Sequence, residues 1–383
     1  MKARRRNRSA QQITRDRKLI AFFATVLLVS GAALAAHLAR AEAPPVQAVE
    51  RTVPMGEDDR LSIQFVGDTM LGDDAQALLD RFGYDWPLAA MAPQLDGDHV
   101  IANAEGPFTL VRQPYNRAKS SFYPASPAAA GALARAGVDT IALGNNHAMD
   151  AGPQGLADTF TNAEAAGLSA FGAGHDLAGA QRPLILHSTF GDVGVVALGE
   201  NFGRTSRAAD AAPGTVVLSP ETVQRGIDLA RAAGADWVIA YVHWGDNYVQ
   251  ITDQQRYWAQ MLVKAGYDMV IGTGPHVTQP IEVIDSVPVA YSIGNFAFGA
   301  AGGFSSHGVP GYGLMISAVF TRHAQVTVSV RCLLTDDAVV NFQPIPCTPE
   351  QAAVLLPAYN PDMAVLGNVG LLPCACSPRG SRE

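Results

Sequence analysis

The stretch VDTIALGNNHAMDAG, residues 138–152, is an apolar run that ends in two amides, an imidazole and a carboxylate. Its aliphatic and β-branched residues predict a buried strand over 138–143. Gly152 and Pro153, which follow the polar residues, are typical of the start of a helix. This order of strand, polar turn and helix indicates an α/β fold with a site where the strand ends.

The alternation of strand and helix continues for nearly three hundred residues. Further strands are predicted over 61–67, 99–104, 184–188, 193–199, 237–243 and 267–272, and helices over 127–136, 153–166, 219–233 and 253–265. The first strands are expected to be parallel and buried. Short β-rich segments at 280–293, 312–320 and 325–331 favour antiparallel pairing in a second sheet. Two sheets with outer helices would follow.

The N-terminus predicts export. The first eighteen residues carry eight Lys or Arg and one acid, and residues 19–36 form an uncharged apolar run. Such a run fits either a signal peptide, cleaved near Ala39-Arg40-Ala41, or an uncleaved anchor. Both alternatives stay open, and both place the remaining chain outside the cytoplasm. With 383 residues, 48% of them hydrophobic, the chain is long enough to bury a full core.

The net charge limits which partners the chain can bind, and the cysteine positions limit which disulfides it can form. Without the leader, 19 basic and 34 acidic residues remain, a balance of −15. This balance argues against nucleic acid, and it repels an anionic polymer unless a metal or a local cationic groove intervenes. All four cysteines lie in the last fifth of the chain and lack zinc-finger spacing. Three pairings are possible, and Cys332 with Cys347 is the first expectation in an oxidising compartment.

Five strand ends carry polar side chains of kinds that bind metals or move protons. These side chains are Asp68, Glu105, the group Asn145, Asn146 and His147, then His243 and His276. A single histidine at a strand end is more often structural than catalytic. Five such ends together indicate a site, because open α/β sheets collect their active sites at the carboxyl ends of strands.

Carboxylate, amide and imidazole together suit manganese, iron or zinc better than calcium. Glu105 can bridge two ions, and Asn146 can offer an amide oxygen. His147 is placed to act as an acid toward a leaving group. Asp150, three residues on, can fix the tautomer of His147 and raise its pKa. The alternative is that Asn146 and Asp150 only cap the following helix.

Six motifs carry a family resemblance. VGDTMLG, NAEGPFT, LGNNHAMDAGPQGL, VHWGDNY, GPHVTQPIEV and YSIGNFAFG occur in this order between residues 66 and 299. The chain resembles the CapA family of bacterial capsule and poly-γ-glutamate synthesis proteins, within the calcineurin-like metallophosphoesterase superfamily. The resemblance implies a four-layer α/β/β/α sandwich of the metallophosphoesterase type, with one or two metal ions at the strand ends.

By this resemblance, the metal ligands are Asp68, Glu105, Asn146, His243 and His276, and the catalytic pair is His147 with Asp150. Lys119, Asn145, Trp244 and Asn295 are expected to bind substrate. The alternatives are an exposed surface lysine for Lys119, a core position for Trp244, and a loop-holding role for Asn295. In VHWGDNY, Tyr248 is a further cleft residue under the same alternative as Trp244.

Three positions depart from the pattern of these relatives. Met70 stands where the wider superfamily has a histidine, and Gly274 stands where the family often has one. Asn247 replaces a frequent Glu, although Asp246 lies beside it. Each ion would then keep about three protein ligands, which fits an open site completed by water. A single ion, or a site that binds metal without turnover, is also compatible with these residues.

The sequence divides into a signal or anchor at 1–41, a linker at 42–59, a CapA-like metallophosphoesterase domain at 60–345 and a Cys- and Pro-containing tail at 346–383. The resemblance implies an extracytoplasmic bacterial protein, secreted or membrane-anchored. Its expected activity is metal-dependent hydrolysis of phosphoester type on a cell-envelope or anionic polymer. The alternative is a non-catalytic surface subunit that works with membrane subunits of a polymer synthase. A purely structural or binding module is the third hypothesis.

Overall fold

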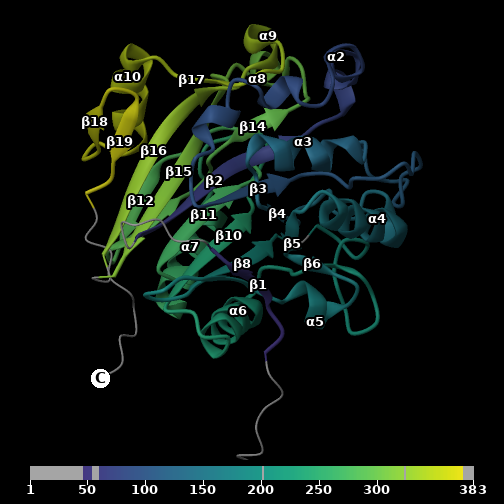
Figure 1. The fold of residues 1–383 in the computed structure, drawn as a ribbon, viewed down its shortest axis with the longest axis horizontal. Helices are drawn as coiled ribbons and strands as arrows, with labels where there is room; N and C mark the ends of the chain where they lie inside the picture. Colours follow the sequence, from purple (N-terminus) through teal and green to yellow (C-terminus); the bar gives the residue numbers. More distant parts are fainter. Residues whose placement is uncertain (1–45, 54–59, 201, 323–324, 374–383) are drawn as a thin grey trace, which may run out of the picture. The chain divides into compact units, whose positions relative to one another are not determined.

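The computed structural model describes residues 46–53, 60–200, 202–322 and 325–373 (Figure 1). The predicted signal or anchor and Cys374 and Cys376 lie outside these ranges. Within them, no helix combines the length and the hydropathy needed to cross a bilayer.

Two large β-sheets form the centre of the fold. Sheet A has seven strands in the order β1 (Val49–Thr52), β7 (Leu184–His187), β8 (Val193–Gly199), β10 (Trp237–His243), β11 (Met269–Thr273), β13 (Val287–Ala290), β12 (Ile281–Ile284). Sheet B has ten strands: β18 (Ala364–Leu366), β19 (Val369–Leu371), β16 (Val326–Leu334), β15 (Tyr312–Thr321), β2 (Arg60–Met70), β3 (His99–Ala104), β4 (Thr140–Ala142) and β5 (Ser169–Phe171), with β14 (Asn295–Phe298) on β2 and β17 (Ile345–Pro346) on β16. A small ribbon pairs β6 (Ala173–Gly174) with β9 (Gly214–Thr215).

Three apolar layers hold the sheets and helices together. Side chains alternate along each strand, so Ile239 and Tyr241 of β10 enter the central layer between the sheets, while Val238 enters an outer one. The outer layer of sheet A is covered by α6 (Pro220–Ala232) and α7 (Asp253–Ala265), and that of sheet B by α2 (Gln76–Phe82), α3 (Ala128–Ala136) and α4 (Gly152–Ala165) (Figure 1). The predicted four-layer α/β/β/α sandwich is therefore confirmed.

Shorter helices complete the connections: α5 (Leu177–Ala180), α8 (Gly303–His307), α9 (Asp337–Val340) and α10 (Pro349–Tyr359). The longer helices begin at clear signals in the sequence. Thr252 and Gln255 form a reciprocal capping box at α7, and Ser219 with Thr222 does the same at α6. The spans predicted from periodicity agree with the observed helices to within one residue at each end.

The predicted assignment of strands to the two sheets was wrong. The later antiparallel strands do not form a sheet of their own, because β15 pairs with β2 and so extends sheet B. β12 and β13 extend sheet A, where β13 lies parallel to β11. β7 and β8, expected to be parallel, form an antiparallel pair. Both sheets are mixed as a result.

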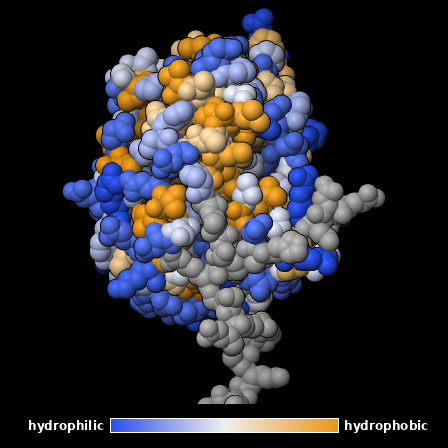
Figure 2. Space-filling view, turned by 90° about the vertical axis from the view of Figure 1, so that its left-hand side faces the viewer, coloured by the Kyte–Doolittle hydropathy of each residue, from blue (hydrophilic) through white to orange (hydrophobic). Residues whose placement is uncertain are grey.

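The ends of the described chain also join the sheets. β1, in the segment predicted as a linker, lies parallel to β7, and β19, in the predicted tail, pairs with β16. Figure 2 shows apolar surface among polar residues on the side that carries the C-terminal elements. Val354 of α10 and Leu366 of β18 are among the exposed apolar side chains in these elements.

The disulfide between Cys332 and Cys347 confirms the first expected pairing. It links β16 to the segment that leads into α10, and both cysteines are buried.

We expect the double replacement Cys332→Ala/Cys347→Ala to lower the free energy of unfolding by about 3 kcal/mol, because the bridge closes a loop with a separation of 15 residues. Urea denaturation of the oxidised protein and the variant measures this difference. Equal midpoints with equal slopes would show that the bridge contributes nothing to stability.

Candidate metal centre

The candidate ligands come from the carboxyl ends of strands in both sheets. Asp68 lies near the end of β2, and Glu105 directly follows β3. Asn146 and His147 follow β4 in sheet B, whereas His243 ends β10 in sheet A. Parallel pairing of β3 with β2 and with β4 brings the residues of sheet B to one edge, and the stacking of the sheets adds His243.

Glu105 is the centre of the cluster. Asp68, Glu105 and His243 offer ligand atoms that all lie within 4.8 Å of one another. The Nε2 atoms of His147, His243 and His276 lie 3.8, 3.8 and 3.9 Å from Glu105 Oε1. These separations are too long for hydrogen bonds. For His243 and His276, the expected ligands, they are near the separation of about 3.4 Å between two atoms that each lie about 2.1 Å from one tetrahedral metal.

Unpartnered polar atoms test whether a cation fits this site. Both carboxylate oxygens of Glu105 and the side-chain oxygen of Asn146 are buried without a hydrogen-bond partner. Burial of such atoms is costly unless another group satisfies them, and a buried charge normally pairs or coordinates a metal. The three oxygens and the neighbouring imidazoles suit a divalent ion of the manganese, iron or zinc type.

Burial and neighbouring charges set the pKa values of the cluster in the absence of a metal ion. Burial raises the pKa of Glu105 to about 8, since its ionised form has no partner in the protein. Burial also lowers the pKa of His243 to about 3, so that imidazole is neutral and can ligate. For His276, burial acts in the lowering direction, but the charges of Glu105 and Asp68 outweigh it and raise the pKa to about 9.

A second set of contacts fixes His147. Its Nδ1 lies 2.6 Å from Asp150 Oδ2, and because a carboxylate only accepts, Nδ1 carries the proton and Nε2 faces Glu105. Lys119 Nζ donates to the other oxygen of Asp150, at 2.5 Å, and to the backbone oxygen of Asn146, at 2.8 Å. Lys119 is therefore part of the cluster rather than a free surface lysine.

The helix-cap alternative does not describe Asp150. α4 begins at Gly152, and its N-cap residue, Ala151, makes no side-chain cap bond. Asp150 Oδ2 instead accepts from the Tyr123 backbone N–H and from His147. Asp150 acts to raise the pKa of His147, as expected, but burial outweighs it and lowers that pKa to about 4. His147 is therefore neutral near pH 7.

Asn145 and Asn103 form a buried scaffold beneath the cluster. The Asn145 side chain donates to Asn103 Oδ1 and the Ala104 carbonyl, and it accepts from the backbone N–H groups of His147 and Ala148. Asn103 in turn donates to Asp68 Oδ1 at 2.7 Å. Asn145 is fully buried, which differs from its expected contact with substrate. Sequence reasoning missed Asn103, although an amide inside the buried strand HVIANA was a signal.

We expect Asn145→Ala to lower the free energy of unfolding by about 3 kcal/mol, because three buried backbone groups lose their partner. Thermal and urea denaturation measure this loss, with Asn247→Ala, an exposed amide in the loop after β10, as the matched control. If the variant were as stable as the unmodified protein and only its KM were raised, Asn145 would instead be a substrate-binding residue.

Two further residues that were expected to contact substrate, Trp244 and Asn295, are buried and have other contacts. The side chain of Trp244 is fully buried. It packs in the outer apolar layer of sheet A, where Nε1 donates to the Tyr291 carbonyl at 2.7 Å. Asn295 is buried, and its Oδ1 lies 2.9 Å from His276 Nδ1. Asn295 thus orients His276, in agreement with its alternative role. Trp244, which directly follows β10, thus occupies the core position that was its alternative.

Aromatic rings frame the imidazoles, and Tyr123 was not found from the sequence. Its ring stacks on His147 with centroids 4.2 Å apart, while its backbone N–H holds Asp150. Gly106 makes room for this segment, since a Cβ there would lie 2.3 Å from the Tyr123 carbonyl oxygen. On the other side, Tyr248 packs on His276 at 5.6 Å.

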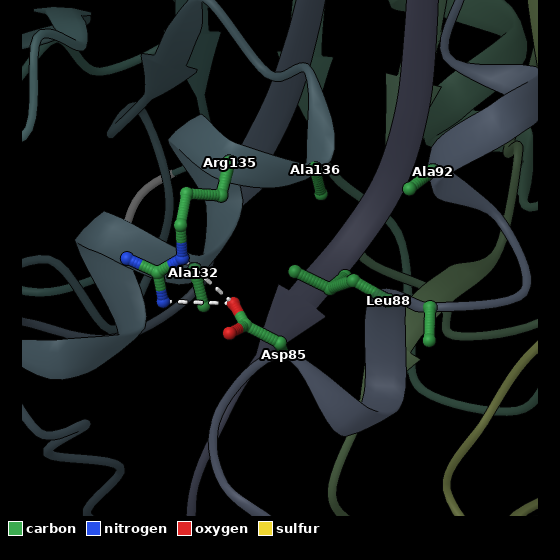
Figure 3. Close-up of a pocket in the computed structure, with 7 residues that line it drawn as sticks. Asp85, Leu88, Ala92, Ala132, Arg135 and Ala136 are labelled. Carbon is green, nitrogen blue, oxygen red and sulfur yellow. Dashed lines mark hydrogen bonds and ion pairs between the residues drawn. The ribbon is translucent and has the colours of Figure 1, made fainter.

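A separate apolar cavity lies between α3 and the segment before β3 (Figure 3). It has a volume of about 170 Å³ and is lined mainly by alanines and Leu88. Its two charged residues, Arg135 and Asp85, already pair with each other at 2.7 Å. None of the candidate metal ligands lines this cavity, so we do not assign it as the functional site.

Comparison with known proteins agrees with the motif pattern. The family described as bacterial capsule synthesis protein PGA_cap matches residues 62–300. The chain is 30% identical over 264 residues to the capsule biosynthesis protein CapA of Bacillus anthracis, covering 66% of this chain and 64% of that protein. It is 32% identical over 245 residues to the PGA biosynthesis protein CapA of Bacillus subtilis (strain 168), covering 63% and 64%.

The chain spans 64% of the length of each of these two relatives. Among solved structures, it is similar to the NAD nucleotidase NadN of Haemophilus influenzae, with a TM-score of 0.41 and 11% sequence identity. That match covers 76% of this chain and 54% of the nucleotidase.

Proposed function

This chain belongs to the family of bacterial capsule synthesis proteins PGA_cap, and on that premise we propose that it is a metal-dependent hydrolase of phosphoesterase type. Its substrate would be a cell-envelope or capsular polymer of the poly-γ-glutamate kind. The observation that carries the proposal is Glu105, a buried carboxylate with both oxygens unpartnered among three imidazoles.

The residues divide into two groups by role. Asp68, Glu105, Asn146, His243 and His276 would hold one or two divalent ions. When bound, such ions act as Lewis acids on a phosphoryl oxygen and lower the pKa of water. The protein's own contribution is to fix these ligands and to exclude bulk water from buried side chains.

Proton transfer is assigned to His147. Asp150 and Lys119 hold its ring, so Nε2 points toward Glu105 and the reacting atoms. A neutral Nε2 accepts a proton from the attacking water, and the same atom returns it to the leaving oxygen. Asp150 stabilises the imidazolium formed in between, because its ionised carboxylate accepts from Nδ1.

The setting of this activity is also a proposal. The buried disulfide supports an oxidising, extracytoplasmic compartment, and the basic and apolar segment at 1–36 supports export with or without a retained membrane anchor. The names of the relatives, which are capsule and PGA biosynthesis proteins, support a place in a polymer synthesis system.

A second candidate function is a surface subunit of such a system that does not turn over substrate. Met70, buried at the end of β2, and Gly274 favour it, because both positions lack the imidazole found in related sites. The cluster would then bind metal to stabilise the fold.

Assay of the purified full chain on bis(p-nitrophenyl) phosphate separates the two candidates. The hydrolase requires turnover that a chelator removes and manganese restores. Metal binding without turnover, on this substrate and on capsular polymer, would support the non-catalytic subunit instead.

A further inference from the structure

Two loops beside the metal centre carry exposed arginines in an otherwise acidic chain. Residues 106–123, after Glu105, contain Arg112, Arg117 and Lys119 and no acid, and residues 201–209 contain Arg204 and Arg207 and no acid. The whole chain carries a net charge of −8. The first stretch is therefore net positive, whereas Glu200 and Asp210, at the two ends of the second, offset the charges of Arg204 and Arg207.

The two loops meet at one pocket. Asn116, Lys119 and Ser121 of the first loop and Thr205 and Ser206 of the second line it together. Asp150, which holds His147, lines the same pocket. The Lys119 ammonium group already donates to Asp150 and Asn146, but the amide and the hydroxyls of the lining can donate to an oxyanion.

Both loops are anchored to the candidate metal centre. The first is held by Lys119, whose Nζ contacts Asp150 and the backbone of Asn146. The second is held by Phe202, whose ring packs edge-on against His243 with centroids 5.7 Å apart. Lys119 and Asp150, which line the pocket, therefore also contact residues of the candidate centre.

Two arginines of these loops, Arg117 and Arg204, are placed to meet a ligand at the pocket. Arg117 and Arg204 adjoin the pocket residues Asn116 and Thr205, and both are exposed. Neither makes an ion pair within the described ranges, whereas Arg135, Arg231 and Arg256 each pair with an acid. Arg112 donates only to the backbone carbonyls of Thr109 and Val111.

We infer that the pocket and its two arginines form a subsite for a second anionic group, so that the protein binds a linear polyanion across the metal centre. This inference rests on the proposed function for what happens at the centre. The repeating group is a carboxylate or a phosphate, since both meet the same donors. Local positive charge would offset the repulsion that the acidic chain otherwise exerts on such a polymer.

The test compares two double variants with the same change in net charge. Arg117→Gln/Arg204→Gln removes the cations at the pocket, and Arg225→Gln/Lys264→Gln removes exposed cations on α6 and α7. Fluorescence anisotropy measures binding of labelled poly-L-aspartate and of labelled poly(glycerol phosphate), in chelator so that metal cannot contribute.

We expect Kd to rise about fivefold in the pocket variant and to stay unchanged in the control. A rise with poly-L-aspartate assigns carboxylates, and a rise with poly(glycerol phosphate) alone assigns phosphates. Equal Kd values in both double variants would overturn the subsite. The outcome is independent of catalysis, because failure of the hydrolase proposal appears as lack of turnover on bis(p-nitrophenyl) phosphate by the unmodified protein.

Discussion

Replacing Glu105 by Gln is expected to weaken divalent metal binding by at least about 100-fold and to abolish turnover. The carboxylate lies within 3.9 Å of three imidazoles, and removal of its charge affects every ligand pair in the cluster. Mutation of residues that only support metal ligands typically lowers metal affinity about 10- to 100-fold. Loss of a central ligand should therefore lower the affinity by at least about 100-fold. Isothermal titration with manganese measures the change.

Ionisation of Glu105 should also make the stability of the protein depend on pH. Because burial raises the pKa of Glu105 to about 8, the metal-free fold holds this proton between about pH 4.5 and 8 while the unfolded chain has lost it. The unfolded state binds fewer protons in this window, so the metal-free protein loses stability as pH rises. Manganese requires the ionised carboxylate and a deprotonated His276, so its stabilising effect grows with pH.

Differential scanning fluorimetry with and without manganese from pH 5.5 to 8.5 measures this pH dependence. The unmodified protein should show a rise in Tm on metal addition that increases with pH. Glu105→Gln should show no such rise, together with a metal-free Tm that falls less with pH. A manganese-dependent Tm in the variant equal to that of the unmodified protein would remove Glu105 from the site.

Replacing His147 by Ala is expected to lower kcat by about 10²- to 10⁴-fold, the usual contribution of a positioned acid or base. Metal content should stay near that of the unmodified protein, because the other ligands remain. Steady-state kinetics on bis(p-nitrophenyl) phosphate, with metal analysis of the same samples, measures both quantities.

Tyr123→Phe is the matched control for His147→Ala. It keeps the ring that stacks on His147 and the backbone N–H that holds Asp150, so kcat should change little. Loss of metal together with activity in His147→Ala would make that residue a ligand. Unchanged kcat in the same variant would exclude proton transfer by His147.

The strands and helices that position the site were largely predictable. β3, β8, β10 and α7 have the bounds that periodicity predicts, because each is an uninterrupted apolar or amphipathic run with clear ends. Polar residues directly after those runs also indicated where the cluster would form. Active sites of α/β proteins lie at the carboxyl ends of strands, so the order of residues along the chain is enough to locate the site.

Features that depend on contacts between distant segments could not be predicted. The alternation in β15 is compatible with either sheet, and only its pairing with β2 places it in sheet B. Asn103 lies inside an apolar strand, so its bond to Asp68 is not visible in the sequence. The lowered pKa of His147 results from burial by several segments, whereas its spacing to Asp150 alone suggested the opposite direction.

The most direct test of the account is the metal content of the purified full chain after manganese loading and dialysis, beside Glu105→Gln treated in the same way. Plasma mass spectrometry should find one or two equivalents of divalent metal in the unmodified protein and far less in the variant. A folded, unmodified chain that retains no metal under these conditions would contradict the assignment of Asp68, Glu105, His243 and His276 as a metal centre.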